Sequence, residues 1–434
     1  MTGDIARRLT SPVALFGYAI FALLIAPAML NGFPLVMSDS IAYSGEGVNW
    51  MRAKSPALLM TLPYKALGYW ATPLVNSALI AGAWMLLIRA FDLKPNILVL
   101  LGLILISLQP LYASAVLVDA WFFPAIVLLA ASLRQSLLMT GAVAGLLLSA
   151  HGSGQIMAVV FAVLAFLLCR SRRPVWAAVI AAVVAFGMNA VLDASIEPDT
   201  PRLARTFPAA RVFSVQPELL VREADRSGNV VLEESAALVI DLKADPENRL
   251  RRDLFWDVWK QTEGRFDLVE FESRHALPIL KDAWVYRPSE LVRAVLQDFA
   301  SFYGPDTEFD FRPVLSETFP PPFQSSWQAE GVFSSSLAEG IATFMRYMLY
   351  AIFVTAILFY WNKADPLTRR NVIAITLLVL ANDFLFALLS GPPDRYHHRV
   401  LPFLAVAILL LVSPRSTPRE AAAAEIDALP ESGQ

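Results

Sequence analysis

The sequence predicts an all-α integral membrane protein with about ten membrane-spanning helices. Of its 434 residues, 56% are hydrophobic and only 17% are charged, whereas soluble domains carry about 25% charged residues. Apolar runs long enough to cross a bilayer recur along the chain, and a helix satisfies its own backbone hydrogen bonds inside lipid. One long polar stretch, between the seventh and eighth runs, predicts a small helical domain outside the membrane.

The apolar runs and the charges between them divide the chain into four parts. Residues 1–195 contain seven predicted spans, with amphipathic segments at 40–70 that we expect to lie in the membrane interface. Residues 196–336 form the polar domain, residues 337–413 contain three more spans, and the tail at 414–434 is expected to be disordered. The predicted spans cover residues 12–31, 73–91, 96–112, 116–133, 136–150, 154–169, 174–194, 338–361, 371–389 and 399–413.

The basic residues between the spans predict the orientation of the chain in the membrane. They gather at alternate ends of successive spans, namely at Arg7, Arg8, Arg89, Lys94, Arg134, Arg170, Arg172, Arg173, Lys363, Arg369, Arg370, Arg415 and Arg419. The side that carries most Lys and Arg in short loops is cytoplasmic, so both termini are expected inside. The stretch around Asp39, the turn at Asp119, the polar domain and the loop at 390–399 are then expected outside.

Composition and missing motifs exclude several classes of function. The net charge is −3, whereas a nucleic-acid partner requires a basic face. The single cysteine, Cys169, excludes an intramolecular disulfide and a multi-cysteine metal site. The sequence has no P-loop, no Gly-rich dinucleotide fingerprint and no Gly-x-Ser-x-Gly elbow. We therefore expect no ATP, NAD or serine-hydrolase chemistry and no nucleic acid.

Asp39 lies in "NGFPLVMSDSIAYSGEG", shortly after the first predicted span, with Ser38 and Ser40 beside it. One interpretation is a helix cap, since Ser and Asp are preferred at that position and a cap contributes about 1 kcal/mol. The other is a general base, because a carboxylate in a partly desolvated cleft at the membrane surface can take a proton from a hydroxyl. The residue types leave both interpretations open.

Asp119 and His151 are the next candidate site residues. Asp119 follows "LQPLYASAVLVDAWFFP", and an acid within apolar sequence is costly in lipid, so it should face the bundle interior or a wet cavity. His151, in "LLLSAHGSGQ", lies between two apolar runs near the same predicted face. Each has a structural alternative: Asp119 as a helix cap or buried hydrogen-bond partner, and His151 as a structural hydrogen-bonding residue.

The stretch "SGPPDRYHHR" at residues 390–399 holds the densest set of polar side chains. It carries Asp394, Arg395, Tyr396, His397, His398 and Arg399 in a predicted outer loop. The planar guanidinium suits a phosphate and stays charged in an apolar site, so these side chains are candidates for binding an anionic substrate. The alternative is a surface pair of Asp394 with either arginine, beside lipid headgroups. The histidine spacing fits no recognised zinc pattern, so no metal site is predicted, and a divalent metal stays as the weaker alternative.

The order of these features resembles the GT-C fold of membrane glycosyltransferases. In "PLVMSDSIAY", Asp39 matches the acid of the family's first outer loop, "RAKSPALL" at 52–59 resembles the segment that follows, and Asp119 corresponds to the acid of the second outer loop. The run "DRYHHRVLPF" at 394–403 is similar to the arginine–tyrosine-then-proline pattern of a late outer loop. The chain also looks like a group of proteobacterial integral membrane proteins with related first and last loops.

The resemblance implies an inverting transferase at the periplasmic face of a bacterial inner membrane, with membrane lipid around it and a polyprenyl-phosphate-linked sugar as donor. Asp39 would be the general base, and Arg395, with Arg399, would hold the lipid phosphate. Asp119 and His151 would orient or polarise the site, which Tyr396 would line. Serines flank Asp39 where related enzymes carry a second acid, so metal use is not implied. The rival hypotheses are a transporter, flippase or scaffold for a lipid-linked glycan, and an acyltransferase or polymerase.

Overall fold

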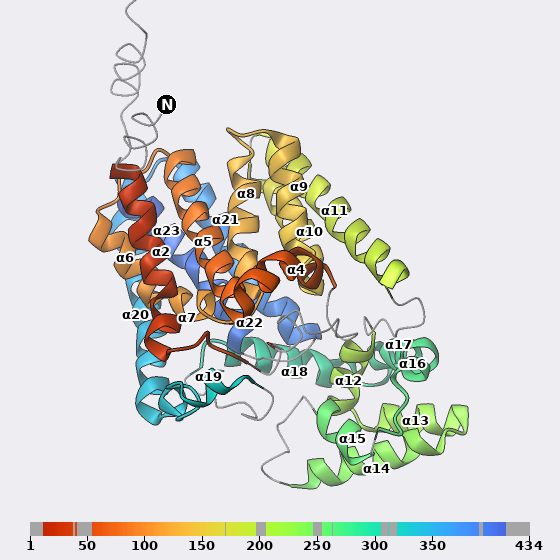
Figure 1. Cartoon of the computed structure of the whole chain (residues 1–434). Helices are drawn as coiled ribbons and strands as arrows, with labels where there is room; N and C mark the ends of the chain where they lie inside the picture. Colours follow the sequence, from red (N-terminus) through yellow and green to blue (C-terminus); the bar gives the residue numbers. More distant parts are fainter. Residues whose placement is uncertain are drawn as a thin grey trace, which may run out of the picture.

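The computed structural model describes residues 12–37, 40, 54–169, 171–196, 205–245, 254–262, 264–304, 311, 319–389 and 394–413 (Figure 1). Within these ranges the protein is built from helices, and the described residues form no β-strand beyond one isolated bridge between Leu35 and Ala115. The predicted all-α fold is therefore confirmed for the part of the chain that is described. The predicted tail at 414–434 lies outside it.

Among the described residues, five helices are long and apolar enough to cross a membrane. They are α2 (Pro12–Asn31), α5 (Ala71–Ala90) with the preceding α4 (Ser55–Leu67) and η1 (Gly68–Trp70), α11 (Arg173–Ile196), α20 (Ser336–Tyr360) and α21 (Pro366–Leu389). These helices have the length and composition expected of an integral membrane protein.

The other five predicted spans fall on shorter apolar helices. They are α6 (Ile97–Ile106), η2 with α8 (Asp119–Trp121 and Phe122–Ala131), α9 (Leu137–Leu148), α10 (Gly152–Leu168) and α22 with α23 (Asp394–His398 and Leu401–Val412). At 1.5 Å per residue, a helix of about 20 residues is needed to cross the hydrocarbon core. The structure therefore supports five membrane-length helices and leaves the total of ten as a prediction.

The predicted continuous helix at 96–112 is broken in the structure. α6 ends at Ile106, Leu108 adopts a left-handed conformation with φ 59°, and α7 (Gln109–Ala113) follows with Pro110 in its first turn. Proline favours the first turn of a helix, where its missing N–H needs no partner. The chain thus changes direction at Leu108 and leads into the loop that carries Asp119.

Close packing of α9 on α11 gathers the helices around the site. Gly141 and Gly145 face α11, and a Cβ on Gly145 would lie 2.7 Å from the carbonyl oxygen of Ala181. Glycines four residues apart let two helix backbones approach closely in apolar surroundings. Because α10 follows α9 directly, this contact also fixes where α10 begins.

The polar block forms a second group of helices around its own core (Figure 1, green). Its elements are α12 (Thr206–Val215), α13 (Glu218–Ser227), α14 (Val230–Ala244), α15 (Phe255–Gln261), α16 (Leu268–Glu270), the π-helix η3 (Phe271–His275), α17 (Ala276–Tyr286) and α18 (Pro288–Ser301). Phe213, Leu220, Phe271 and Ile279 are buried in that core. α12 and α18 pack against α21, so the block is attached to the apolar bundle.

Candidate functional site

Asn76 on α5 holds the loop that positions Asp119. Its side-chain Nδ2 donates to the carbonyl oxygens of Ala113, Ala115 and Leu117 at 3.3, 3.1 and 2.9 Å. Its Oδ1 accepts a hydrogen bond from the Trp121 indole at 2.8 Å. A buried amide that uses both ends in this way satisfies an irregular backbone at membrane depth. The loop before α8 is thereby fixed to a long helix.

The segment after α2 runs beside the same loop. Leu35 donates to the carbonyl oxygen of Ser114 at 3.0 Å and accepts from Val116 at 2.8 Å. Gln328, from the distant end of the polar block, accepts a hydrogen bond from the Val36 amide at 2.9 Å. Asp39 itself lies outside the described residues, but Met37 and Ser40 on either side of it are buried. The segment that precedes Asp39 and the segment that precedes Asp119 are therefore hydrogen-bonded to each other.

Arg399 is the centre of a buried polar cluster. Its Nη2 donates to Asn382 Oδ1 at 2.7 Å and to Ser153 Oγ at 3.0 Å, and its Nε donates to Asn382 Oδ1 at 3.1 Å. The guanidinium carbon lies 4.6 Å from the ring centres of both Phe122 and Phe386. Protein groups and aromatic faces thus surround this cation.

Asp119 faces Arg399 from the clamped loop. Asp119 Oδ1 lies 3.6 Å from Arg399 Nη1, and both side chains are almost completely buried. A buried carboxylate is tolerated in apolar surroundings when a cation accompanies it. The pair brings together residues separated by 280 positions in the sequence, which the sequence analysis placed on the same face.

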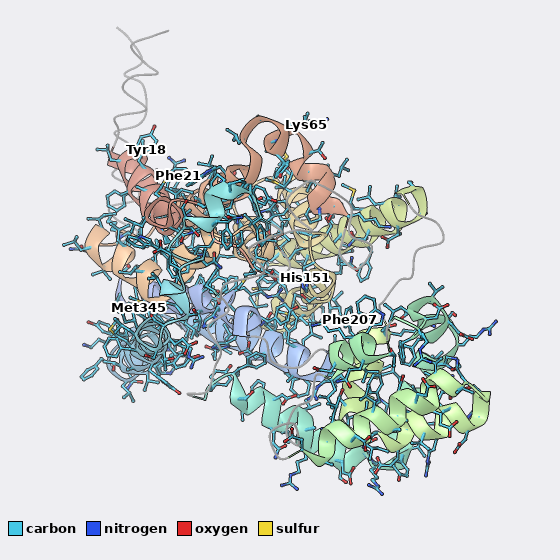
Figure 2. The ribbon with its side chains drawn as sticks, turned by 60° about the horizontal axis from the view of Figure 1, so that its bottom comes forward. Tyr18, Phe21, Lys65, His151, Phe207 and Met345 are labelled. Carbon is cyan, nitrogen blue, oxygen red and sulfur yellow. The ribbon has the colours of Figure 1, made fainter. Side chains whose placement is uncertain are left out.

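His151 joins the cluster through Ser153. His151 caps α10, with its Nδ1 accepting from the Ser153 amide at 3.2 Å and lying 2.7 Å from Ser153 Oγ. Its ring meets Tyr396 edge to face, with ring centres 5.6 Å apart. Gly154 permits this turn, since a Cβ there would lie 2.3 Å from the Leu148 carbonyl oxygen. Figure 2 shows His151 on the side of the bundle that faces the polar block.

His397 stands in a chain of four hydrogen-bonded side chains. Its Nδ1 lies 2.8 Å from Asp383 Oδ2, its Nε2 bonds with the hydroxyl of Tyr350, and Tyr303 donates to Asp383 Oδ2 at 2.7 Å. The carboxylate accepts from Nδ1–H, so the Nε2 of the neutral ring accepts from Tyr350. Burial, and then the Asp383 charge, raise the pKa of the Tyr303 hydroxyl above its usual range. Tyr303 therefore stays protonated and remains a donor.

Asn382 links the two halves of the cluster. It accepts from Arg399 through Oδ1, and its Nδ2 donates to Asp383 Oδ1 at 3.1 Å and to the Tyr396 carbonyl oxygen at 2.9 Å. His398, next to His397, forms a 2.7 Å hydrogen bond with the hydroxyl of Tyr112 through its Nδ1. The cluster thus contains side chains from α7, η2, α10, α20, α21 and α22.

Arg346 on α20 is the residue that the sequence analysis missed. Its guanidinium is 1% exposed, and its Nη2 donates to the Gly304 carbonyl oxygen at 2.7 Å. Among the described residues its Nε and Nη1 are buried without a hydrogen-bond partner, and its guanidinium carbon lies 5.4 Å from the centre of the Tyr347 ring. It lies near enough to His398 to act on it electrostatically. A lone arginine inside an apolar run, "ATFMRYMLY", is the signal that would have found it.

The candidate residues fall into two groups. The structure brings Asp119, His151, Tyr396, His397 and Arg399 together. Asp39 and the side chains of Asp394 and Arg395 lie outside what is described. The expected loop at 390–399 is wrong in part, since residues 394–398 form the helix α22. The hydrogen bonds of Asn382 with Arg399 and with the Tyr396 backbone stabilise this helical turn against α21.

The geometry favours different roles for the buried arginines Arg399 and Arg346. Arg399 is occupied by Asn382, Ser153 and Asp119, so its expected use as an anion receptor has no support in these contacts. Arg346 retains two unused donor atoms in the interior. An unpaired charge there costs several kcal/mol, which a bound anion would offset. Among the described residues, no three His, Cys, Asp or Glu side chains gather as metal ligands.

Comparison of this chain with protein-family models, curated proteins and solved structures found no match. The chemistry of the site therefore rests on its own residues.

Proposed function

We propose that the chain crosses a bacterial inner membrane about ten times, with both termini in the cytoplasm. The five shorter apolar helices coincide with the five predicted spans that the long helices do not account for. On the proposed inner face, Arg173 donates to the carbonyl oxygen of Ser132 at 3.0 Å and Arg369 to that of Trp361 at 2.9 Å, where helices end. Cations at helix C-termini are favourable and agree with this orientation.

We propose that the protein is a GT-C-type glycosyltransferase that acts at the periplasmic face. The observation that carries this proposal is the buried cluster around Arg399, together with Arg346, whose Nε and Nη1 have no hydrogen-bond partner among the described residues. The polar side chains of the cluster come from six elements that range along the chain from α7 to α22. Buried polar residues inside an apolar bundle are energetically costly and occur mainly where they serve a function.

The proposed reaction transfers a sugar from a polyprenyl-phosphate donor to a hydroxyl of a glycan, lipid or protein. Asp39 takes the proton of the acceptor hydroxyl, whose oxygen forms a bond to the anomeric carbon. The bond from that carbon to the phosphate oxygen breaks with inversion, and the phosphate leaves with its electron pair. Rate enhancement comes from positioning and from stabilising the charge on the leaving phosphate.

Arg346 is the described residue best suited to hold that phosphate. Nε and Nη1 leave donor hydrogens unused on both edges of the planar guanidinium, and such edges bind phosphate oxygens. Arg395 keeps the same role as a prediction. Asp119 and His151 act through Arg399 and Ser153, and their proposed role is to position the helices that border the site.

The second candidate function is a transporter for a lipid-linked glycan. A row of hydrogen-bonded ionisable side chains favours the transporter, because such rows inside membranes also serve as proton relays. The row consists of Tyr303, Asp383, His397 and Tyr350. A transporter is expected to show two related halves or paired broken helices, and the sequence contains no internal repeat.

The deciding experiment replaces Asp39 with Asn in the native host. Surface glycans and glycolipids are compared by mass spectrometry at matched protein abundance. Loss of one sugar, equal to the loss in a deletion strain, is the result expected of a transferase. A normal glycan profile in the variant, with an altered profile in the deletion strain, would contradict the general-base role and favour transport or scaffolding.

The phosphate role is tested separately with Arg346→Gln. We expect weaker donor binding, so the rate falls at low donor concentration and recovers partly at high concentration. Arg369→Gln is the matched control, because Arg369 lies at a helix end and bonds backbone carbonyls. An unchanged donor dependence in Arg346→Gln would contradict this role.

A further inference from the structure

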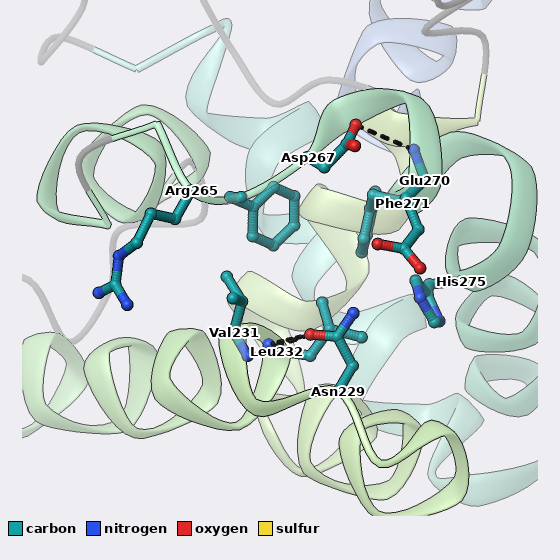
Figure 3. Close-up of a pocket in the computed structure, with 9 residues that line it drawn as sticks. Asn229, Val231, Leu232, Arg265, Asp267, Glu270, Phe271 and His275 are labelled. Atoms are coloured by element: carbon teal, nitrogen blue, oxygen red, sulfur yellow. Dashed lines mark hydrogen bonds between the residues drawn. The ribbon is translucent and has the colours of Figure 1, made fainter.

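A pocket in the polar block has the features of a ligand site. Asn229, Val231, Leu232, Arg265, Phe266, Asp267, Glu270, Phe271 and His275 line it (Figure 3). Its volume is ≈ 40 Å³, whereas a single water molecule requires about 10–15 Å³ measured in this way. The pocket therefore has room for more than one water molecule or for one small group of a larger ligand.

His275 lines this pocket and has an unused nitrogen atom. Its side chain is about 5% exposed, and its Nε2 has no hydrogen-bond partner among the described residues. Its Nδ1 lies 2.9 Å from Glu223 Oε1. Because the carboxylate accepts from Nδ1–H, Nε2 of the neutral ring carries a lone pair and needs a donor. A buried acceptor without a partner is unfavourable by about 1–3 kcal/mol.

Several contacts hold the imidazole in this orientation. Glu223 Oε2 accepts from Arg226 at 3.0 Å, and Arg226 donates to Asp282 at 2.7 Å. His275 also ends the π-helical turn η3, which carries Phe271 on the same side. Single π-helical turns are rare and occur frequently at functional sites. The orientation of the ring is therefore built by several elements.

The rest of the lining indicates the chemistry of the ligand. Val231, Leu232, Phe266 and Phe271 supply apolar walls. Of the charged lining residues, Asp267 caps α16 through Oδ1, Glu270 is paired with Arg274 at 3.1 Å, and Arg265 is paired with Glu234 at 2.9 Å. The acceptor left open beside the apolar walls, His275 Nε2, favours a group that donates one hydrogen bond and has a carbon face. A neutral hydroxyl fits better than an ammonium, because an ammonium carries three donors and a charge that must be desolvated.

We propose that this pocket binds a sugar or similar polyol, with one hydroxymethyl group seated between Phe271 and Val231 and its hydroxyl donating to His275 Nε2. The choice of a glycan as the natural ligand rests on the proposed transferase function. The site itself rests on the geometry of the pocket.

Histidine NMR of the full-length protein in detergent micelles tests the proposal with glucose and glycerol as probes. The chain has four histidines, His151, His275, His397 and His398, so one substitution assigns the His275 signals. We expect saturable movement of the His275 Nε2 resonance with glucose, while the other three stay in place. Ethanolamine and acetate are the charged control ligands.

Two variants separate binding from folding. His275→Asn keeps a donor toward Glu223 and removes the Nε2 acceptor, and Val231→Phe fills the pocket while keeping His275. Both should weaken glucose binding, measured by saturation-transfer NMR, by about tenfold or more, equivalent to one lost hydrogen bond at a buried acceptor. Each variant is first checked for an unchanged melting temperature within a few degrees.

No response of His275 to glucose or glycerol would overturn the proposal and leave the pocket to water. A response to ethanolamine alone would overturn the hydroxyl assignment, and full glucose binding by both variants would move the ligand elsewhere. The transferase is tested independently of this result. Glucose binding that persists in a protein whose Asp39→Asn strain has normal glycans would retain the pocket and reject the transferase.

Discussion

A histidine paired with a carboxylate occurs in two regions of the molecule, and the second ring nitrogen has different surroundings in each. In the apolar bundle, His397 Nδ1 lies 2.8 Å from Asp383, and in the polar block, His275 Nδ1 lies 2.9 Å from Glu223. In the bundle the second ring nitrogen, His397 Nε2, is hydrogen-bonded to the hydroxyl of Tyr350. In the polar block the second nitrogen, His275 Nε2, has no partner among the described residues, and His275 lines a pocket.

The difference reflects the surroundings of each pair. Inside an apolar bundle no water is present to satisfy a polar atom, so the cluster around His397 must be closed by protein groups. A pocket in the polar block can leave one acceptor open, because water or a ligand can occupy it. The closed pair is suited to holding helices in place, and the open pair is suited to binding.

Arg399→Met breaks the closed cluster most severely. It leaves Asp119 buried without its cation and removes the donors to Asn382 and Ser153. Removing one partner of a buried pair costs about 3–5 kcal/mol, so the melting temperature in detergent should fall by many degrees. Tryptophan fluorescence during heating measures the effect. A melting temperature equal to that of the wild type would mean that Arg399 does not hold the bundle together.

Asp383→Asn and Glu223→Gln compare the two regions directly. Asp383 accepts from three side chains, so we expect its replacement to cost about 1–3 kcal/mol. Glu223→Gln keeps an acceptor for His275, which lines a pocket that water can enter. We therefore expect the free energy of unfolding to fall by about 1 kcal/mol or less. Thermal unfolding of both variants under one condition gives the comparison. Equal losses would contradict the distinction between a closed and an open pair.

Arg346→Met should change stability in the opposite direction from Arg399→Met. It removes a buried cation whose Nε and Nη1 have no partner, and replacing buried charge by apolar groups is often neutral or stabilising by about 1 kcal/mol or more. The melting temperature of the ligand-free protein should stay level or rise while donor binding is lost. A large fall in melting temperature would show that Arg346 is a structural residue.

The helical class and the positions of the apolar segments could be predicted from sequence, because burial in lipid demands long apolar runs. The path of the loop after α7 could not, since Asn76 holds it from another helix. The sequence predicts a loop at 394–398, where the structure has a helix, for the same reason: its polar residues are stabilised by α21, which local propensity does not reveal.

The proximity of Asp119, His151 and Arg399 could be predicted, because strict alternation of the spans across the membrane places these three residues on the same side. Their exact partners did not follow, because Asn382 and Ser153 are ordinary polar residues until the helices pack. Arg346 was recognisable as a cation inside an apolar run. His275 was not, since its significance depends on Glu223 occupying one nitrogen and leaving the other open.

Asp92→Asn provides an exposed reference with the smallest expected effect. Asp92 and Arg134 form a 2.7 Å ion pair between helix ends, and both side chains are more than half exposed. The hydrogen bond from Arg134 lowers the pKa of Asp92, so the pair stabilises the folded protein above the unfolded-state pKa of about 3.9 and loses this contribution as the pH falls further. The wild type should exceed the variant by at most about 1 kcal/mol at pH 7. Melting curves at pH 7 and pH 3 should show the difference shrinking, and a constant difference would mean that it does not come from the charge of Asp92.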